Sequence, residues 1–185
     1  VERPAIASIT LIGNEDIRGE DLIDNLRQIG FAEGRAFDRS QLEKLEQELT
    51  RQYNSLGKYA VKLESTVTEL ESNRVAVTIE ISEGIAAKIQ KINIVGNTVY
   101  KEKKLIKKFK LSTPSLFSFY TKSDQYSRQK LSADLESLRS YYLNNGYINF
   151  NIDSTQVSIT PDKKGIYITI NITEGELFTI SEVRL

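Results

Sequence analysis

The stretch KINIVGN at residues 91–97 repeats the pattern of SITLIGN at residues 8–14, and this repetition decides the fold. At one constant offset the apolar positions of the two stretches coincide, and both stretches end in Gly-Asn. The matched pairs are Ile6 with Ile89, Ile9 with Ile92, Leu11 with Ile94, Ile12 with Val95, Gly13 with Gly96 and Asn14 with Asn97. Each stretch has the pattern of a strand that ends at a glycine turn. The repeat therefore predicts two modules in tandem.

Each copy continues with two helical patterns. GEDLIDNLRQIG at residues 19–30 predicts a short helix, and DRSQLEKLEQELTRQYNSLGKY at residues 38–59 predicts a longer one, with Asp38 or Ser40 as its N-cap. Gly57 and Gly146 are suited to end the long helices, because glycine tolerates a left-handed backbone. The apolar stripe recurs every three or four residues, at Leu42, Leu45, Leu49 and Tyr53 in the first copy and at Leu131, Leu135, Leu138 and Tyr142 in the second.

Two strands complete each copy. The last strand of each copy alternates apolar and polar residues, in RVAVTIEISEG at residues 74–84 and in GIYITINITEG at residues 165–175. Hairpin turns at ELESN and TPDKKG join this strand to the one before it. The predicted fold is α+β, with β-α-α-β-β modules in which two helices cover a three-stranded mixed sheet. FTISEVRL at residues 178–185 starts the pattern a third time. The expected modules are residues 1–88 and 89–176, and residues 177–185 form the first strand of a truncated next module.

Composition narrows the function classes. The 185 residues are 39% hydrophobic and 27% charged, enough for two small cores of about 90 residues each. The absence of cysteine and histidine excludes a disulfide framework and a thiolate metal site, and it removes the commonest general base. No apolar run reaches the ~20 residues of a membrane span. Because the chain does not begin with methionine, we expect a fragment whose targeting signal lies upstream.

Charge is distributed unevenly between the two copies. Residues 1–88 contain 11 Lys/Arg and 16 Asp/Glu, whereas residues 89–185 contain 14 and 9. Such asymmetry indicates either different neighbours with an end-to-end electrostatic fit or two unrelated solvated surfaces.

The carboxylates at equivalent places in the two copies are Glu83 in ISEG and Glu174 in ITEG. Neither has a second titratable group within motif range, and the sequence has no phosphate-binding glycine loop, serine elbow or metal-ligand spacing. We therefore expect no enzyme activity, no catalytic residue, no metal and no cofactor. Glu83 with Gly84, and Glu174 with Gly175, are interpreted as inter-module joints at which a glycine turns the chain.

Lysines are concentrated in YKEKKLIKKFKL at residues 100–111. The order β-α-α-β-β superficially suggests a nucleic-acid-binding KH module, but neither copy has its G-x-x-G clamp or a set of stacking aromatics. We interpret the lysines as the solvated face of a helix, and attraction to anionic lipid or an acidic partner stays open. Aromatic residues of the loop at 112–125 either pack under it or form an exposed anchor. The candidate accessory contacts are Lys107, Lys108, Phe117, Phe119 and Tyr120.

YINFNIDSTQVSITP at residues 147–161 changes the parity of its apolar positions from even to odd. One extra residue near Asp153–Gln156, a β-bulge, would keep both sets on the core side. Bulges are common on edge strands, whose unpaired backbone groups accept a further strand. A bulge that only protects the edge from aggregation explains the pattern equally well. The candidate binding edge consists of Tyr147, Ile148, Phe150, Ile152, Asp153, Ser154, Thr155, Gln156, Val157 and Ile159.

A unit that ends in ISEG or ITEG and is followed by an I-x-x-I-x-I-V-G-N strand resembles the POTRA (polypeptide-transport-associated) module. The resemblance extends to the BamA family of outer-membrane β-barrel assembly factors and covers essentially the whole chain. It rests on ERPAIASIT, LGKY, IQKINIVGN and the long stretch at residues 138–175. The resemblance implies the second and third POTRA modules of an array and the opening strand of the fourth. It also implies a location on the periplasmic face of the outer membrane of a Gram-negative bacterium.

In that family the array precedes a C-terminal membrane barrel, receives unfolded outer-membrane β-barrel proteins and docks accessory lipoproteins. The resemblance implies strand addition at Tyr147–Thr160 and a BamB-like lipoprotein docked around the same module. The expected function is thus a non-enzymatic scaffold that pairs transiently with client backbones. The alternatives are the POTRA array of another transporter, TamA-like or of two-partner secretion, and a basic nucleic-acid-binding module. Nucleic acid is not the expected partner.

Overall fold

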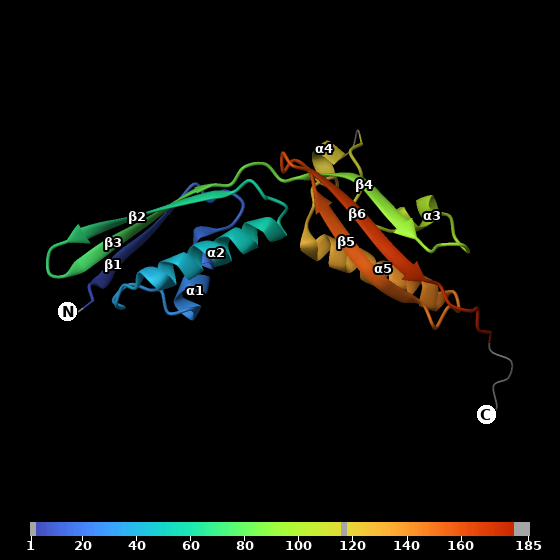
Figure 1. Cartoon of the computed structure of the whole chain (residues 1–185), viewed down its shortest axis with the longest axis horizontal. Coiled ribbons are helices and arrows are strands. Elements are labelled where there is room, and N and C mark those ends of the chain that lie inside the picture. The colour runs from blue at the N-terminus through green and yellow to red at the C-terminus, as the bar shows by residue number, and fades with distance from the viewer. Residues whose placement is uncertain (1–2, 116–117, 180–185) are drawn as a thin grey trace, which may run out of the picture. The chain divides into compact units, whose positions relative to one another are not determined.

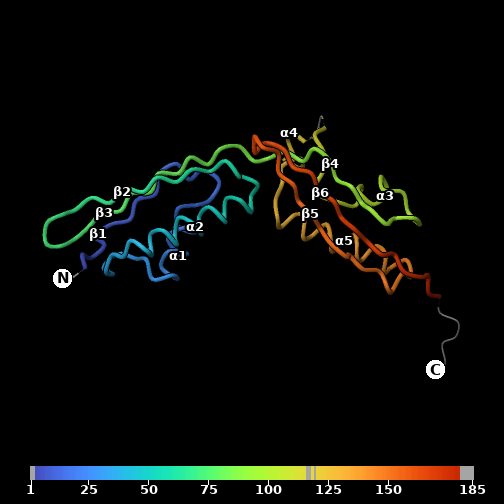
Figure 2. The backbone as a smooth tube through the Cα atoms, viewed as in Figure 1, coloured from blue at the N-terminus to red at the C-terminus, as the bar shows by residue number. Residues whose placement is uncertain are grey.

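The computed structural model describes residues 3–115 and 118–179, and the chain divides into two compact units, Val1–Ile85 and Ala86–Leu185 (Figure 1, Figure 2). Each unit contains one three-stranded mixed sheet in which the last strand of the unit is central. The α+β fold class that the sequence predicts is confirmed.

The first unit runs β1 (Ala5–Ile12), α1 (Gly19–Gln28), α2 (Arg39–Ser55), β2 (Lys62–Leu70) and β3 (Arg74–Ser82). The central strand β3 pairs in parallel with β1 and antiparallel with β2. Both helices lie on the same face of this sheet (Figure 1). The core between the two layers contains the predicted residues of β3 and α2, which are Val75, Val77, Ile79, Ile81, Leu42, Leu45, Leu49 and Tyr53.

The second unit runs β4 (Lys88–Val95), α3 (Glu102–Ile106), α4 (Ser118–Thr121), α5 (Arg128–Asn144), β5 (Asn151–Ile159) and β6 (Gly165–Thr173). Here β6 is central, parallel to β4 and antiparallel to β5. Its alternate isoleucines are buried, as are three of the four predicted stripe positions of α5, and Leu135 is half-buried.

Helix ends follow the predicted capping residues. The Asp38 side chain accepts a hydrogen bond from the N–H of Ser40 at 2.9 Å, so Asp38 is the N-cap of α2. Gly57 and Gly146 follow α2 and α5 with φ of +80° and +90°, the conformation in which glycine has no steric cost.

The helix in the lysine-rich stretch is shorter than its apolar pattern predicts, because α3 ends at Ile106. Beyond it, the N–H groups of Lys110 and Leu111 donate to the Asp134 carboxylate at 2.7 and 2.9 Å. Asp134 lies on α5 and is fully buried. Burial raises its pKa, and the two backbone donors only partly oppose that rise. Asp134 is therefore a buried position of α5 that the apolar periodicity of the sequence does not reveal.

Close backbone contact explains the repeated glycine at the end of the first strand. Gly13 and Gly96 have φ of +86° and +98°, and a Cβ on either would lie 2.1 Å from the carbonyl oxygen of Ile81 or Ile172. Gly30 also has a positive φ, +85°, but nothing lies within 4 Å of the position of its missing Cβ. Gly13 and Gly96 are therefore required both by backbone conformation and by space.

Gly13→Ala should destabilise the first unit by about 3 kcal/mol, because it combines a left-handed backbone with a clash against the central strand. Gly30→Ala, the matched control, should cost only about 1 kcal/mol, since the conformational cost alone applies. Urea unfolding followed by far-UV circular dichroism measures both losses. Equal losses would contradict the explanation by close contact.

Candidate functional site

One of the two outer strands in the second unit is covered by its own chain. Beside β4, the N–H of Ile89 donates to the carbonyl oxygen of Asp124 at 2.8 Å. Further along, the N–H of Ile94 donates to the Glu102 carboxylate at 2.9 Å. On the opposite side of the sheet, β5 pairs with β6 alone among the described strands. The open edge is thus β5, the strand in which the sequence predicts a bulge.

A bulge interrupts β5 at Asp153. Ile152 is opposite Ile172 and Ser154 is opposite Asn171, so Asp153 is the extra residue. This confirms the β-bulge that the parity change predicts near Asp153–Gln156. The corresponding strand of the first unit, β2, keeps a regular register from end to end.

Short polar bonds hold the bulge in place. The Asp153 carboxylate accepts hydrogen bonds from the side-chain amide of Asn151 and from the hydroxyl of Thr173, each at 2.7 Å. The side-chain amide of Asn171 donates to the Ser154 hydroxyl at 2.7 Å. The bonds from Thr173 and Asn171 join β6 to β5 at the bulge, and the bond from Asn151 lies within β5. Sequence reasoning missed them, although the polar residues of both strands at the bulge were the available signal.

The predicted edge residues separate into two faces. Ile152, Thr155 and Val157 are half-buried, whereas Asp153, Ser154 and Gln156 are exposed. At the end of β5, Ile159 is 42% exposed. An added strand would meet the backbone of this segment, and its side chains would alternate between the same two faces.

Tyr147, Ile148 and Phe150 precede β5 and are not part of the edge strand. Tyr147 and Phe150 are buried against Tyr142, with ring centroids 5.8 and 4.2 Å from its ring. Ile148 is 57% exposed, so it does not face the core as its even parity suggests. The aromatic residues here anchor the loop to α5 through ring packing.

The accessory residues are in two regions. Lys107 is exposed, and the Lys108 ammonium lies 5.3 Å from the centre of the Tyr141 ring, within cation–π range. Tyr120, on α4, is 84% exposed. Phe117 and the side chain of Phe119 lie outside the described residues.

Glu174, predicted to act at a joint, forms hydrogen bonds inside the second unit. Its carboxylate accepts from the hydroxyl and N–H of Thr98 at 2.5 and 2.8 Å, from the N–H of Val99 at 3.0 Å and from the Tyr142 hydroxyl at 2.6 Å. The side chain is buried. It therefore connects the end of β6 to the loop after β4 and to helix α5.

Glu83 forms the equivalent hydrogen bonds in the first unit and also pairs with a lysine. Its carboxylate accepts from the N–H groups of Glu15 and Asp16 at 2.7 and 2.9 Å and from the Tyr53 hydroxyl at 3.0 Å. The Lys58 ammonium forms an ion pair with the same carboxylate and with that of Asp16. The following glycines, Gly84 and Gly175, have positive φ, and their role at inter-module joints stays a prediction. Sequence reasoning did not connect each glutamate with the tyrosine of the long helix that donates to it, Tyr53 or Tyr142. The available signal was that both copies contain the same tyrosine and glutamate.

Both carboxylates have a pKa below the ordinary carboxyl value, so both are ionised at neutral pH. Burial raises the pKa of Glu174, but the donors from Thr98, Tyr142 and Val99 outweigh burial and hold that pKa below its ordinary value. At Glu83 burial likewise raises the pKa, and the Lys58 ammonium with the backbone and tyrosine donors lowers it further than burial raises it. Burial and the adjacent carboxylate raise the pKa of Tyr142, so its hydroxyl remains a donor.

Glu174→Gln should destabilise the second unit by about 2 kcal/mol at neutral pH. The NH₂ group of glutamine is a donor, so it cannot accept the hydrogen bonds that one carboxylate oxygen accepts. The unmodified carboxylate stabilises the fold above its unfolded pKa near 4.5, and that contribution is lost as pH falls through the lower folded-state value. Urea unfolding at pH 7 and pH 3, read from amide signals of β6, should show a smaller pH effect in the variant. Glu136→Gln, on the exposed face of α5, is the control, and an equal pH effect in all three chains would contradict this assignment.

No group of three or more carboxylates among residues 3–115 and 118–179 is arranged to hold a metal ion. Within the same residues, no helix combines the length and hydropathy needed to cross a membrane.

Similar proteins were found by sequence. A BamA outer membrane protein assembly factor from Neisseria meningitidis serogroup B is 32% identical over the whole chain, which covers 23% of that protein. BamA from Buchnera aphidicola subsp. Acyrthosiphon pisum is also 32% identical, over 97% of this chain and 29% of its own length. The chain thus spans less than a third of these relatives. The solved structure of Haemophilus influenzae BamA POTRA3-5 is 19% identical over 96% of this chain and 68% of its own, with a TM-score of 0.47.

Each of the two units also matches the same family model. The model is that of POTRA, described as a surface antigen variable number repeat, and it matches residues 4–84 and residues 87–175. Because these matches leave out little more than the two ends, they account for both copies of the repeat. The chain belongs to the POTRA family.

Proposed function

We propose that this chain is a periplasmic part of an outer-membrane protein assembly factor and that β5 accepts an extended segment of an unfolded β-barrel client. POTRA membership and the names of the curated relatives support the assembly role. The observation that carries the client site is the open edge at β5, since the opposite edge is closed at Ile89 and Ile94. Backbone pairing suits clients of many sequences, because every peptide offers the same donors and acceptors.

The bulge at Asp153 limits how tightly a client pairs. An extra residue breaks the regular spacing of edge donors and acceptors and increases the local twist. A client strand would pair on one side of the bulge at a time, which keeps the contact short. Short pairing favours release, and a scaffold that passes clients onward needs release as much as capture.

The position in the array follows the same proposal. Residues 1–88 and 89–176 are the second and third modules, residues 177–185 begin the fourth, and a membrane-embedded C-terminal barrel belongs to the whole protein. A BamB-like lipoprotein docks on the second unit, where Lys107, Lys108 and Tyr120 offer charge and an exposed ring. Other lipoproteins of the machinery contact the rest of the array.

A titration of the ¹⁵N-labelled chain with an end-blocked nine-residue peptide of alternating polar and apolar residues tests the client site. Amide shifts should concentrate at Asn151–Ile159 and depend little on salt, because backbone pairing carries no net charge. Asp153→Ala should weaken binding about threefold, because the loss of its hydrogen bonds to Asn151 and Thr173 leaves this part of the edge less ordered for a client to pair with. Glu69→Ala, on the regular edge strand β2, is the matched control.

Two outcomes would reject strand addition at β5. Shifts centred on Lys101–Lys110 that disappear with added salt would indicate electrostatic attraction to the lysines instead. A peptide methylated on alternate backbone nitrogens that binds as well as the parent would show that backbone hydrogen bonds are not used.

A further inference from the structure

The turn between β2 and β3 presents an apolar side chain between two carboxylates. Leu70, the last residue of β2, is 42% exposed, and its neighbours Glu69 and Glu71 are exposed too. Ser72 and Asn73 reverse the chain with φ of 62° and 53°, and the turn projects beyond the helices of its unit (Figure 1). Within residues 3–115 and 118–179, neither carboxylate is part of an ion pair. A single exposed leucine is ordinary on a protein surface, so the charges around it decide what it contacts.

One basic residue completes this hairpin tip (residues 69–74). Arg74 lies directly across the turn from Leu70 and is exposed, and its side chain donates to the carbonyl oxygen of Glu71 at 3.4 Å. That bond uses one of the five N–H donors of the guanidinium. The tip therefore offers two negative charges and one positive charge around one apolar side chain.

The second unit has an open groove of about 530 Å³ along the outer face of α5. Its floor consists of short side chains on one face of that helix, Ala133, Ser137, Ser140 and Asn144. Lys108 and Tyr141 line one side of the groove, and the helical period puts Glu136 on the other side of the floor. The Ser137 hydroxyl donates to the Ala133 carbonyl oxygen at 2.9 Å, so an apolar group above it does not break a needed bond. The floor thus leaves room for one apolar side chain.

Aromatic rings hold two ammonium groups at one side of this α5 groove. The Lys104 ammonium lies 4.7 Å from the centre of the Tyr100 ring and 5.8 Å from that of Tyr141. The Lys108 ammonium lies 5.3 Å from the Tyr141 ring centre. Because cation–π contact already orders both lysines, less side-chain entropy is lost when they pair with an anion. Lys104 and Lys108 therefore form a preordered lysine rim.

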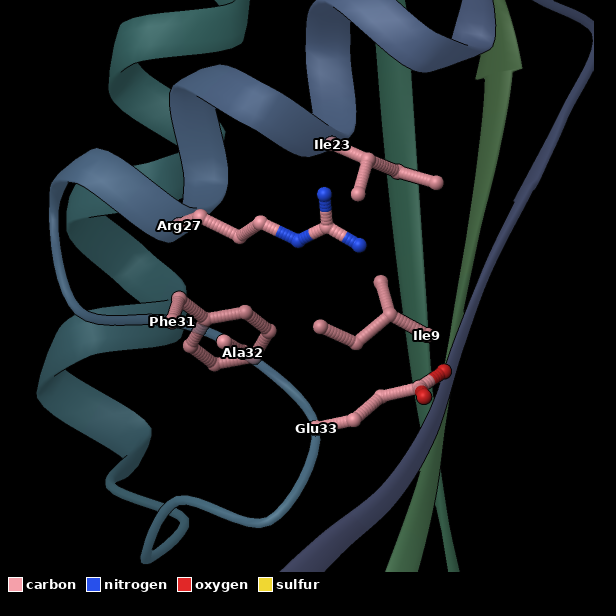
Figure 3. Close-up of a pocket in the computed structure, with 6 residues that line it drawn as sticks. All are labelled: Ile9, Ile23, Arg27, Phe31, Ala32 and Glu33. Carbon is pink, nitrogen blue, oxygen red and sulfur yellow. The ribbon is translucent and has the colours of Figure 1, made fainter.

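The pocket between α1 and β1 in the first unit does not match the hairpin tip (Figure 3). Its volume is about 190 Å³, and it contains one cation and one anion, because Arg27 points into it and Glu33 extends a carboxylate towards β1 (Figure 3). Arg27 also pairs with Asp24 at 3.0 Å. An acidic tip would be repelled by Glu33 and would compete with Asp24 for the only guanidinium that lines this pocket. Size and charge therefore favour the α5 groove.

We propose that the hairpin tip of one copy of this chain docks in the α5 groove of a second copy. Leu70 lies above the short side chains of the floor and packs against the Tyr141 ring. The two carboxylates of the tip pair with the lysine rim, and Arg74 meets Glu136 on the other side of the floor. Each charge of the tip thus faces a charge of opposite sign.

The overall charges of the two units favour the same pairing. Residues 1–88 contain five more acidic than basic residues, and residues 89–185 contain five more basic than acidic ones. Unlike units of two copies therefore attract each other, and like units repel. The contact does not depend on the function proposed for β5. Because it uses Lys108, a lipoprotein docked at that lysine would exclude the second copy.

The test mixes two variants of the whole chain, each of which retains one half of the contact. The tip variant carries Leu70→Ser and Glu71→Gln, and the rim variant carries Lys104→Gln and Lys108→Gln. When unlabelled rim variant is added to ¹⁵N-labelled tip variant at about 1 mM, amide signals of residues 133–144 should shift. Raising the salt concentration from about 50 to about 300 mM should weaken this association about threefold. Unlabelled tip variant added to labelled tip variant is the matched control and should shift nothing.

A charge reversal tests the pairing itself. Glu71→Lys in the chain that supplies the tip should weaken the association about tenfold, and Lys108→Glu in the chain that supplies the groove should restore it. Sedimentation of the unmodified chain should become faster with rising concentration at low salt, whereas that of the tip variant should stay constant. Absence of shifts at residues 133–144, equal shifts in both mixtures, or no recovery in the reversed pair would overturn the proposal. Signals that differ between the unmodified chain and the tip variant equally at every concentration would show contact within one chain and overturn it too.

Discussion

A buried carboxylate at the end of the central strand holds each unit together. Glu83 and Glu174 accept hydrogen bonds from the loop after the first strand and from the tyrosine of the long helix. Sheet, loop and helix thus meet at one charged group. Leaving such a group without its donors is costly, because a buried charge needs full hydrogen bonding. The glycines that pack on the adjacent carbonyl groups, Gly13 and Gly96, bring the loop near enough for these bonds.

Which backbone groups reach solvent depends on small differences along the sheet edges. A three-stranded sheet has two outer strands, and each offers unpaired donors and acceptors. In the second unit, a loop and Glu102 close the β4 edge, which leaves β5 with its bulge. In the first unit, the loop residues Gly34 and Arg35 exchange backbone hydrogen bonds with Ile6 at the β1 edge. The two copies of one fold therefore cover their sheet edges with different groups.

Divergence between the copies is also visible in their charges. The first unit neutralises Glu83 with Lys58, whereas the second places Tyr147 after the corresponding glycine and uses hydrogen-bond donors alone. The lysines of the second unit lie around Tyr100 and Tyr141, with the Lys104 ammonium 4.7 Å from the Tyr100 ring centre. Cation–π contact gives part of the lysine-rich stretch a structural role.

Periodicity by itself determined the repeat, the element order and most of the core, because burial of an oily face constrains every second strand residue and every third or fourth helix residue. The parity change in β5 even located the bulge, since one extra residue lets Ile152 and Val157 lie on the same side of the sheet. Periodicity could not show that Glu83 and Glu174 face inward, that Asp134 accepts hydrogen bonds from the backbone beyond α3, or that Tyr147 and Phe150 belong to a loop. Those outcomes depend on partners distant in sequence, whose approach only the tertiary structure decides. The same holds for the edges: a strand's pattern does not reveal which loop or carboxylate will cover it.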